Sequence, residues 1–361
     1  MQNEYNGRVT RREWFSVAAA APADVHQRIR SMADQAPLSM RFQGATAGEA
    51  RLWQAKFSAR LRQLLGPFDP PARWTTTMES AADFADHRRE TLILESPGVP
   101  PLPVHLLRPR PDRPGKRPAM AALHGHGRWG HDPVAGIATT EEQRNSLAAA
   151  NYDYGLQLAR RGYVVAAPCF TPFGRRLDDP AAYGGGDPCG VTFVRMQLLG
   201  RTLISENLRD ALWAVELLAR QPEVDAARIG CAGLSYGGRM TMLASALSPR
   251  IRAAVISGAL NLMQERILGR YSCGAQVIPG LLEFGDVPEI IGLIAPRPCV
   301  LEIGQRDALM VKDRIGPAMD RIRAVYAALG AADKVETDSF DGGHRWNGAK
   351  AYPMLSSILR P

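Results

Sequence analysis

The chain has 361 residues, of which 45% are hydrophobic and 22% are charged, and its formal net charge is +8 at pH 7. This composition fits a globular protein with one large domain, or one domain and an extension. The lysines and arginines are scattered in runs of at most two without interleaved aromatic residues, so nucleic-acid binding is not expected. No apolar stretch is long enough to cross a bilayer.

Five cysteines lie far apart, and no C-x-x-C motif occurs. The sequence therefore predicts neither a disulfide framework nor a zinc ribbon, and a reducing compartment is the simplest fit. Cys231 and Cys299 fall in apolar segments, and we expect both to be buried thiols.

The N-terminal residues leave two locations open. Thr10-Arg-Arg-Glu-Trp-Phe15 resembles a twin-arginine export signal, and small residues follow it. The apolar stretch behind the arginines is shorter than the hydrophobic region of a signal peptide. We therefore expect a cytoplasmic protein, with export through a twin-arginine-like N-terminus as the alternative.

Residues 1–89 are predicted to form an N-terminal helical extension that packs against a main domain over 90–361. Helical periodicity over 24–65 ends at Gly66-Pro67. The apolar residues near one face of its second half are Leu52, Phe57, Leu61, Leu64 and Leu65. The β-rich part is expected to begin at Arg89, with two antiparallel strands over 91–94 and 102–107.

From residue 119 onward, apolar strands alternate with helices. Strands are predicted over 119–123, 163–167, 229–232, 251–256, 298–303 and 334–340. Helices are predicted before Gly162 and over 203–220, 240–247, 288–293, 315–329 and 350–359. Strand–helix–strand order with apolar strands indicates an α/β fold, in which a mostly parallel central sheet carries helices on both faces.

A candidate nucleophile lies where one of these strands meets a helix. Gly233-Leu-Ser235-Tyr-Gly237 matches G-x-S-x-G, between the strand at 229–232 and the helix at 240–247. In this context a strained turn exposes the serine hydroxyl above the sheet, and the flanking glycines avoid collisions with neighbouring elements. The alternative is a tight glycine turn in which the serine has no chemical role.

A serine nucleophile needs a base, and the base needs an orienting acid. His344 is the one histidine of seven that follows Ser235, and it lies in a glycine-rich loop after the last strand. Asp307 follows the strand at 298–303. The order Ser235, Asp307, His344 is that of α/β-hydrolases. Asp307 could instead cap a helix, and the rival acids are Glu302, Asp313 and Asp341.

Acyl transfer also requires backbone N–H groups aimed at the developing oxyanion. One N–H is expected from Tyr236, directly after the nucleophile. The other is expected from the loop His124-Gly-His-Gly127, which follows the strand at 119–123. We predict the N–H of His126, with Gly127 as the second choice.

The histidines of this loop also allow a metal hypothesis. His124, His126, His131 and Asp132 lie within nine residues and are potential ligands. No paired-ligand motif such as H-E-x-x-H occurs, so we predict no metal and no other cofactor. His124 is expected to hold the loop through hydrogen bonds of its ring.

These segments together resemble the α/β-hydrolase superfamily, and within it the dienelactone-hydrolase and acetyl-xylan-esterase-like branch. The resemblance spans about residues 90–361 and lies on 124–127, 163–168, 233–238, 294–298, 304–307 and 343–344. It implies a Ser235–His344–Asp307 esterase whose oxyanion hole uses His126 and Tyr236. Dienelactone hydrolases use a cysteine nucleophile, so Ser235 points instead to esters of the deacetylase kind.

We expect a small-molecule ester as partner, with short acyl esters such as acetylated carbohydrates as substrates and homo-oligomerisation left open. The Ser-Tyr-Gly-Gly form of the motif also resembles the prolyl-oligopeptidase group. A serine peptidase acting on short peptides is therefore the alternative, although a helical extension cannot supply that group's β-propeller.

The substrate pocket is expected between the loops at 169–198 and 258–287. The predicted substrate-binding residues are Trp129, Tyr271 and Trp346. Further aromatic residues that could line the pocket are Phe170, Phe173 and Tyr183. Three arginines, Arg128, Arg175 and Arg176, are interpreted as solvated surface rather than as ligands for a substrate carboxylate.

Overall fold

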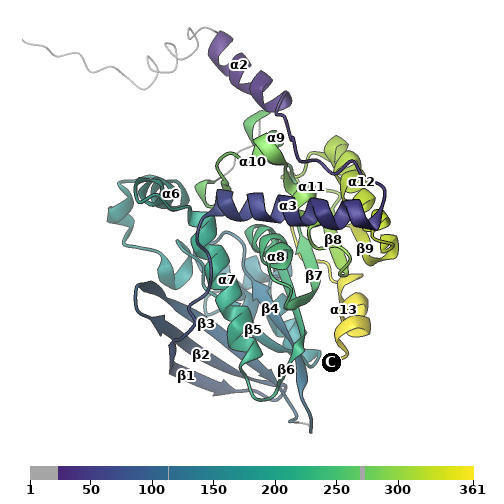
Figure 1. Cartoon of the computed structure of the whole chain (residues 1–361). Helices are drawn as coiled ribbons and strands as arrows, with labels where there is room; N and C mark the ends of the chain where they lie inside the picture. The colour runs from purple at the N-terminus through teal and green to yellow at the C-terminus, as the bar shows by residue number, and fades with distance from the viewer. Residues whose placement is uncertain (1–22, 113, 269–272) are drawn as a thin grey trace, which may run out of the picture.

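The computed structural model describes residues 23–112, 114–268 and 273–361, so the arginine pair at 11–12 and Tyr271 lie outside the described residues. Within these ranges the chain forms a nine-stranded sheet in the order β1-β2-β3-β5-β4-β6-β7-β8-β9 (Figure 1). The strands are β1 (Thr75–Asp83), β2 (His87–Ser96), β3 (Val99–Pro109), β4 (Arg117–Leu123), β5 (Val164–Pro168), β6 (Val224–Leu234), β7 (Ile251–Ser257), β8 (Cys299–Gly304) and β9 (Val335–Phe340).

The first three strands pair antiparallel, and β3 also pairs antiparallel with β5. All pairings from β5 through β4, β6, β7 and β8 to β9 are parallel. The described helices are α2 (Ala23–Asp34), α3 (Ala47–Leu65), α4 (Glu141–Ala150), α5 (Tyr154–Arg160), α6 (Pro188–Leu198), α7 (Leu203–Ala219), α8 (Tyr236–Leu247), α9 (Met263–Leu268), α10 (Leu281–Phe284), α11 (Val287–Gly292), α12 (Lys312–Ala328) and α13 (Ala351–Leu359). This order confirms the predicted α/β architecture.

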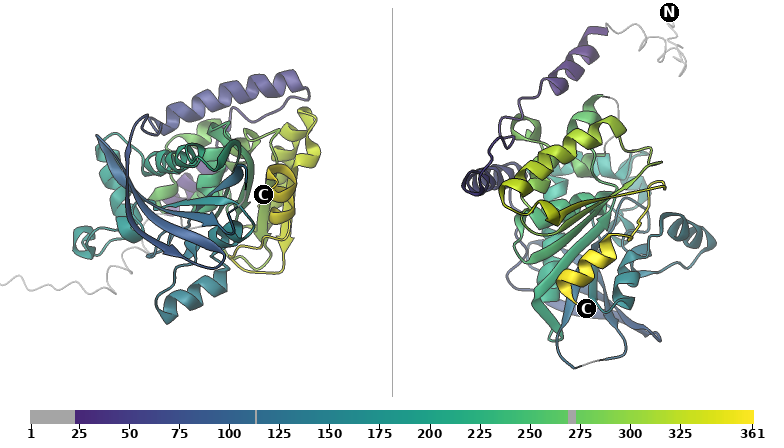
Figure 2. Two further views of the ribbon diagram at one scale, coloured as in Figure 1. Left: turned by 90° about the horizontal axis from the view of Figure 1, so that it is seen from below. Right: turned by 90° about the vertical axis from the view of Figure 1, so that its right-hand side faces the viewer.

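Helices cover both faces of the sheet, which explains why β4 and β5 are buried along their whole length. Side chains of a strand alternate between faces. Accordingly, Ala121 of β4 belongs to a core with residues of α3, α7, α8 and α12, and its neighbour Ala122 belongs to a core with residues of α5 and α13. The right-hand view of Figure 2 shows α12 and α13 on opposite sides of the C-terminal strands.

The N-terminal part differs from the prediction in two ways. The sheet begins at Thr75, so β1 and the start of β2 lie inside the segment predicted as a helical extension. Leu52 is 57% exposed, whereas Phe57 is buried in the main core with Leu61 and Leu65. The reason is angular: successive helical residues differ by about 100°, and Leu52 lies five positions before Phe57, far from its face.

Helix α3 begins at a capping box, in which Thr46 accepts from the N–H of Glu49 and Glu49 accepts from the N–H of Thr46. In the described part of the loop at 258–287, the structure has two short helices, α9 and α10, and a 3-10 turn over 274–276. In the part of the chain that the structure describes, no helix is long and apolar enough to span a membrane.

Candidate active site

Ser235 occupies a sharp turn between β6 and α8, with φ 63° and ψ −121°. A positive φ is strained for a residue with a side chain, and such strain is typical of this nucleophile turn. The glycine on its far side is required by close packing, because a Cβ on Gly237 would lie 1.7 Å from the carbonyl oxygen of Leu123 in β4. The N–H of Ser235 donates to the carbonyl of Ser257 at 2.9 Å, which ties the turn to β7.

Asp307 and His344 meet at the same edge of the sheet. Asp307 follows β8 and is 2% exposed, and its Oδ2 lies 2.7 Å from Nδ1 of His344. Burial alone would raise the pKa of the Asp307 carboxyl, but the hydrogen bond and charge of His344, with the N–H of Leu309, bring it below the usual value. The carboxylate is therefore suited to accept from Nδ1–H of the imidazole.

The other ring nitrogen of His344 lies at a cavity that Ser235 also lines. Ser235 and His344 line one cavity of about 390 Å³. Among the described residues, Nε2 of His344 is buried without a hydrogen-bond partner. Catalytic hydrogen bonds of this kind are often long before a substrate is bound. Gly258 makes room for the ring, since a Cβ there would lie 2.8 Å from Cε1 of His344.

Of the three rival acids, Glu302 and Asp341 have other partners, and Asp313 lies in a helix. Glu302 lies within β8 and accepts from the N–H groups of Asn347 and Gly348, at 3.1 and 2.6 Å. Asp341 is exposed and pairs with Arg306, and Asp313 lies in the first turn of α12. All four acids lie in the part of the chain that the structure describes, and among them Asp307 is the one hydrogen-bonded to His344.

Glu302 makes the stability of the protein depend on pH. Burial raises the pKa of its carboxyl to about 7, although the N–H donors of Asn347 and Gly348 oppose the shift. The pKa of Glu302 is higher in the folded than in the unfolded state. Its contribution to the free energy of unfolding is therefore fully present below the unfolded pKa of about 4.3 and is lost as the pH rises through about 7.

We therefore expect the unfolding free energy of wild type relative to Glu302→Gln to be about 3 kcal/mol larger at pH 4.5 than at pH 8. Urea denaturation of both proteins across this range measures the difference. The matched control is Glu336→Gln on β9, because Glu336 is half exposed beside Lys350. A difference between wild type and Glu302→Gln that stays constant with pH would contradict the assignment.

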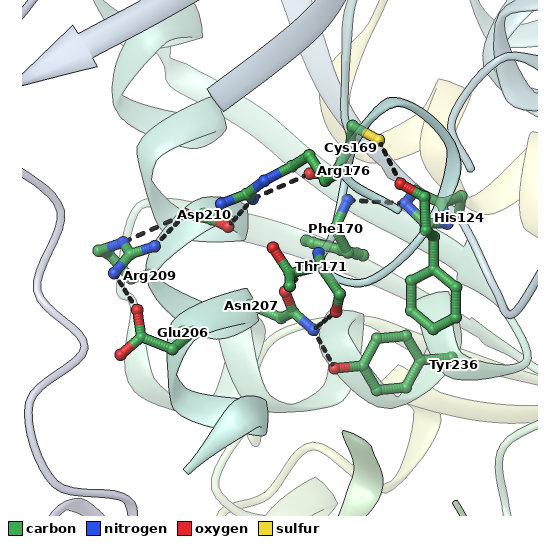
Figure 3. Close-up of polar contacts among 11 residues, drawn as sticks. His124, Cys169, Phe170, Thr171, Arg176, Glu206, Asn207, Arg209, Asp210 and Tyr236 are labelled. Carbon is green, nitrogen blue, oxygen red and sulfur yellow. Dashed lines mark hydrogen bonds and ion pairs between the residues drawn. The ribbon is translucent and has the colours of Figure 1, made fainter. Parts of the chain in front are cut away.

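The loop after β4 is held by His124, as predicted. His124 is 0% exposed, its Nδ1 donates to the carbonyl of Gly125 at 2.7 Å, and its Nε2 accepts from the N–H of Phe170 at 2.8 Å (Figure 3). Burial lowers the pKa of His124 to about 4. The ring is therefore neutral, with its proton on Nδ1, and its two hydrogen bonds hold the loop after β4 against the loop after β5.

A buried polar network behind the site supports both the loop after β5 and the residue that follows the nucleophile. Asn207 of α7 donates to the hydroxyl of Tyr236 at 2.7 Å and exchanges two hydrogen bonds with the backbone of Thr171 (Figure 3). Asp210 of the same helix pairs with Arg176 and Arg209. Asn207 and Asp210 were not predicted from the sequence, although polar side chains inside the apolar pattern of 203–220 were a signal.

One of the three predicted surface arginines is part of the fold. Arg176 is nearly buried in its ion pair with Asp210, so the prediction of solvated surface was wrong for this residue, whose partner is remote in sequence. Arg175 pairs with Glu79 of β1 at 2.5 Å, but its side chain is 40% exposed, as the prediction of surface requires. Arg128 pairs with Glu142 and remains largely exposed.

The predicted oxyanion loop lies at the cavity, but the four residues of the alternative metal hypothesis do not all come together. His126 lines the cavity with Ser235, and Gly127 is not among the described lining residues. The ring of His124 is hydrogen-bonded to the backbone of its own loop, whereas the ligand atoms of His131 and Asp132 lie within 4.8 Å of that of His105. The roles of the His126 and Tyr236 N–H groups stay predictions.

The predicted substrate-binding residues need correction. Trp346 is 0% exposed, stacks on Tyr154 at 4.8 Å and donates from Nε1 to the hydroxyl of Tyr352. It belongs to the core under α13 and cannot contact a substrate. Trp129 is partly exposed beneath the guanidinium of Arg128, and it is not among the described lining residues. Phe170, Phe173 and Tyr183 are buried as well.

The cavity is instead lined by polar residues that the sequence analysis missed, among them Asp187, Arg239, Asn261 and Gln276. Arg239 is 1% exposed and bonds to Asn261, while its Nη1 is buried without a hydrogen-bond partner among the described residues. Burial lowers the pKa of Arg239 to about 10, so it stays a cation at neutral pH. Its place one helical turn after Ser235 was the available signal.

Comparison with known proteins identifies the fold. A solved structure described as "a putative acetyl xylan esterase" from Bacteroides fragilis superposes with a TM-score of 0.72 at 20% identity, over 87% of this chain and 81% of that one. A glucuronoyl esterase from Solibacter usitatus superposes with a TM-score of 0.62 at 15% identity, over 88% and 94% of the two chains. The protein has the α/β-hydrolase fold.

Sequence comparison agrees with this α/β-hydrolase fold. A family model described as acetyl xylan esterase (AXE1) matches residues 201–260, which include the nucleophile turn. A Bacillus subtilis protein named "Putative hydrolase YtaP" is 28% identical over 297 residues, 81% of this chain and 94% of the relative. The expected resemblance to the acetyl-xylan-esterase-like branch and the expected enzyme class, a hydrolase, are thereby confirmed.

Proposed function

We propose that this α/β-hydrolase is a serine carboxylic-ester hydrolase that removes short acyl groups, with acetylated carbohydrates as its substrate class. The observation that carries the proposal is the hydrogen bond between Asp307 and His344 at the cavity lined by Ser235, with Nε2 of His344 unpartnered among the described residues. A carboxylate hydrogen-bonded to an imidazole, at a cavity that a serine also lines, fits the requirements of acyl transfer.

In the proposed mechanism, Ser235 attacks the ester carbonyl while Nε2 of His344 takes the hydroxyl proton. The oxyanion accepts hydrogen bonds from the N–H groups of His126 and Tyr236. His344 then protonates the leaving alcohol and activates a water molecule, which releases the acyl group. Asp307 holds the proton on Nδ1 and stabilises the imidazolium that forms in each half-reaction.

We propose an ester rather than a peptide bond as the bond hydrolysed because of the descriptions of the similar proteins. The family model carries the description acetyl xylan esterase, and the similar structures include proteins named acetyl xylan esterase and glucuronoyl esterase. The peptidase alternative would require a site for a peptide amine or carboxylate next to the scissile bond, and none of the relatives reported above is named a peptidase.

A substrate comparison tests the proposal. We expect kcat/KM for 4-nitrophenyl acetate to exceed that for an aminoacyl 4-nitroanilide by at least about 100-fold, because the pocket stabilises the transition state of the preferred bond. Release of acetate from an acetylated xylo-oligosaccharide, measured alongside, tests the carbohydrate class. Hydrolysis of the anilide at the rate of the acetate would favour the peptidase.

A further inference from the structure

A cluster of soft ligand atoms lies at the rim of the active-site cavity. His126 Nε2, Cys189 Sγ and Cys273 Sγ all lie within 4.8 Å of one another, and Nε2 of His126 is 2.6 Å from Sγ of Cys273. The three residues come from three separate segments: the loop after β4, the first turn of α6, and the start of the 3-10 turn at 274–276. The fold therefore brings these atoms together from distant parts of the sequence.

The two cysteines of this cluster differ from the others in the protein. All five cysteines are described, free and buried. Cys169 donates to the carbonyl of Phe173, and Cys231 lies 3.6 Å from the hydroxyl of Thr241. A buried thiol ordinarily packs in this way, as a small apolar group with a weak donor. In Cys189 and Cys273, by contrast, two thiols and an imidazole converge on one point.

We propose that His126, Cys189 and Cys273 form a binding site for a thiophilic divalent transition-metal ion, with Zn²⁺ as the best match. Two thiolates and one imidazole are preferred zinc ligands, and three protein ligands leave a fourth tetrahedral position for water or another donor. Cysteine and histidine together discriminate against Mg²⁺ and Ca²⁺, which bind oxygen. The site takes the ion directly from solution, because His126 is exposed and lines the cavity with Cys273.

The dimensions of the cluster are compatible with such an ion. Metal–ligand bonds of about 2.3 Å to sulfur and about 2.1 Å to nitrogen separate the ligand atoms of a tetrahedral site by roughly 3.6–3.8 Å. These separations fall within the 4.8 Å that contains the three atoms. Binding would widen the gap between His126 and Cys273 by about 1 Å, which a rotation of either side chain can supply.

The second candidate cluster is less suitable. His105, His131 and Asp132 also bring their ligand atoms within 4.8 Å. However, Nε2 of His105 already bonds to Asp132 at 2.8 Å, and the rings of His105 and His131 stack at 4.0 Å with an angle of 11°. Stacked rings point their nitrogen lone pairs along parallel planes, so they do not converge on a single ion.

An ion at the proposed site would tie together the walls of the cavity. It would join α6 and the turn at 274–276 to His126, whose backbone N–H is the predicted oxyanion donor. Metal binding is therefore expected to stabilise the folded protein, since ligands separated in the unfolded chain are linked only in the native state. This inference does not depend on ester hydrolysis.

The test uses the full chain, freed of any polyhistidine tag and depleted with a chelator. Addition of Co²⁺ is expected to produce thiolate-to-cobalt charge-transfer absorption and the intense visible bands of tetrahedral Co²⁺, and Zn²⁺ should abolish them at one ion per chain. Elemental analysis after gel filtration gives the stoichiometry. Cys189→Ala and Cys273→Ala are expected to weaken binding at least tenfold, whereas the matched control Cys169→Ser is expected to bind as wild type does.

A second measurement uses the wild-type protein, so the proposal can be tested even if the cysteine variants fail to fold. In the wild-type protein, Zn²⁺ is expected to protect Cys189 and Cys273 from alkylation, read by peptide mass spectrometry, without changing the labelling of Cys169, and to raise the melting temperature. Absence of the charge-transfer band in folded wild type would overturn the proposal. So would unchanged Co²⁺ spectra in Cys273→Ala, or visible Co²⁺ bands that are lost in His131→Asn alone, which would assign the ion to the other cluster.

Discussion

Ser235→Ala is expected to lower kcat for 4-nitrophenyl acetate by at least about 10⁴-fold, because the residual groups of a triad give little acceleration without the nucleophile. The fold should persist. Alanine can adopt the turn conformation at the same cost as serine, and the backbone bond from residue 235 to Ser257 remains. The free energy of unfolding should change by less than about 0.5 kcal/mol. Initial rates and thermal melts of the same preparation check both statements.

The matched control for this variant is Ser245→Ala. Ser245 lies on the same helix, is buried, and its Oγ has no hydrogen-bond partner among the described residues. Its replacement is expected to leave kcat/KM unchanged. A fluorophosphonate probe should label Ser235 in wild type and in the control. Wild-type turnover by Ser235→Ala, or a label found on another residue, would remove Ser235 from the mechanism.

Asp307→Asn is expected to lower kcat by about 10³- to 10⁴-fold. The amide keeps the size of the carboxylate, but it lacks the charge that stabilises the imidazolium, and its NH₂ group can turn His344 to the wrong tautomer. The hydrogen bond from Nδ1 to Oδ2, 2.7 Å long, is the contact that changes. Steady-state kinetics with the aryl acetate measure the loss, and labelling by the fluorophosphonate should slow in parallel.

Two further variants separate Asp307 from its rivals. Asp341→Asn removes an exposed acid that pairs with Arg306 and is three residues from His344, and we expect kcat to remain within about twofold of wild type. Glu302→Gln alters an acid that bonds to the backbone of Asn347 and Gly348. A loss in either variant that matched the loss expected for Asp307→Asn would move the role of the acid to that residue.

Much of the candidate site could be predicted from sequence because its signals are local. Gly233 and Gly237 flank Ser235 since side chains would collide there, and a Cβ on Gly233 would lie 2.4 Å from the backbone of Gly237. Apolar segments predicted the parallel strands β4 to β8, because strands covered on both faces are largely apolar. Chain order and the position directly after a strand then favoured His344 and Asp307 over the rival acids, since parallel strands deliver the residues that follow them to one edge.

Other features depended on contacts between distant segments. The sequence does not reveal that Trp346 points into the core beneath α13, that Arg176 meets Asp210, or that β1 extends the sheet. In each case the side chain or strand has several orientations compatible with its local pattern, and a remote partner selects one. Periodicity also misplaced Leu52, whose face of α3 is turned away from the sheet.

The sequence by itself therefore determined the α/β class, the order of the three candidate catalytic residues and the strained turn at Ser235, because sterics and apolar patterning act between near neighbours. Only the tertiary structure decided what lines the cavity: Arg239 with its buried guanidinium, and the convergence of His126, Cys189 and Cys273. Such a constellation is produced by packing loops from separate βα units against one another, and no short-range pattern in the chain encodes where those loops meet.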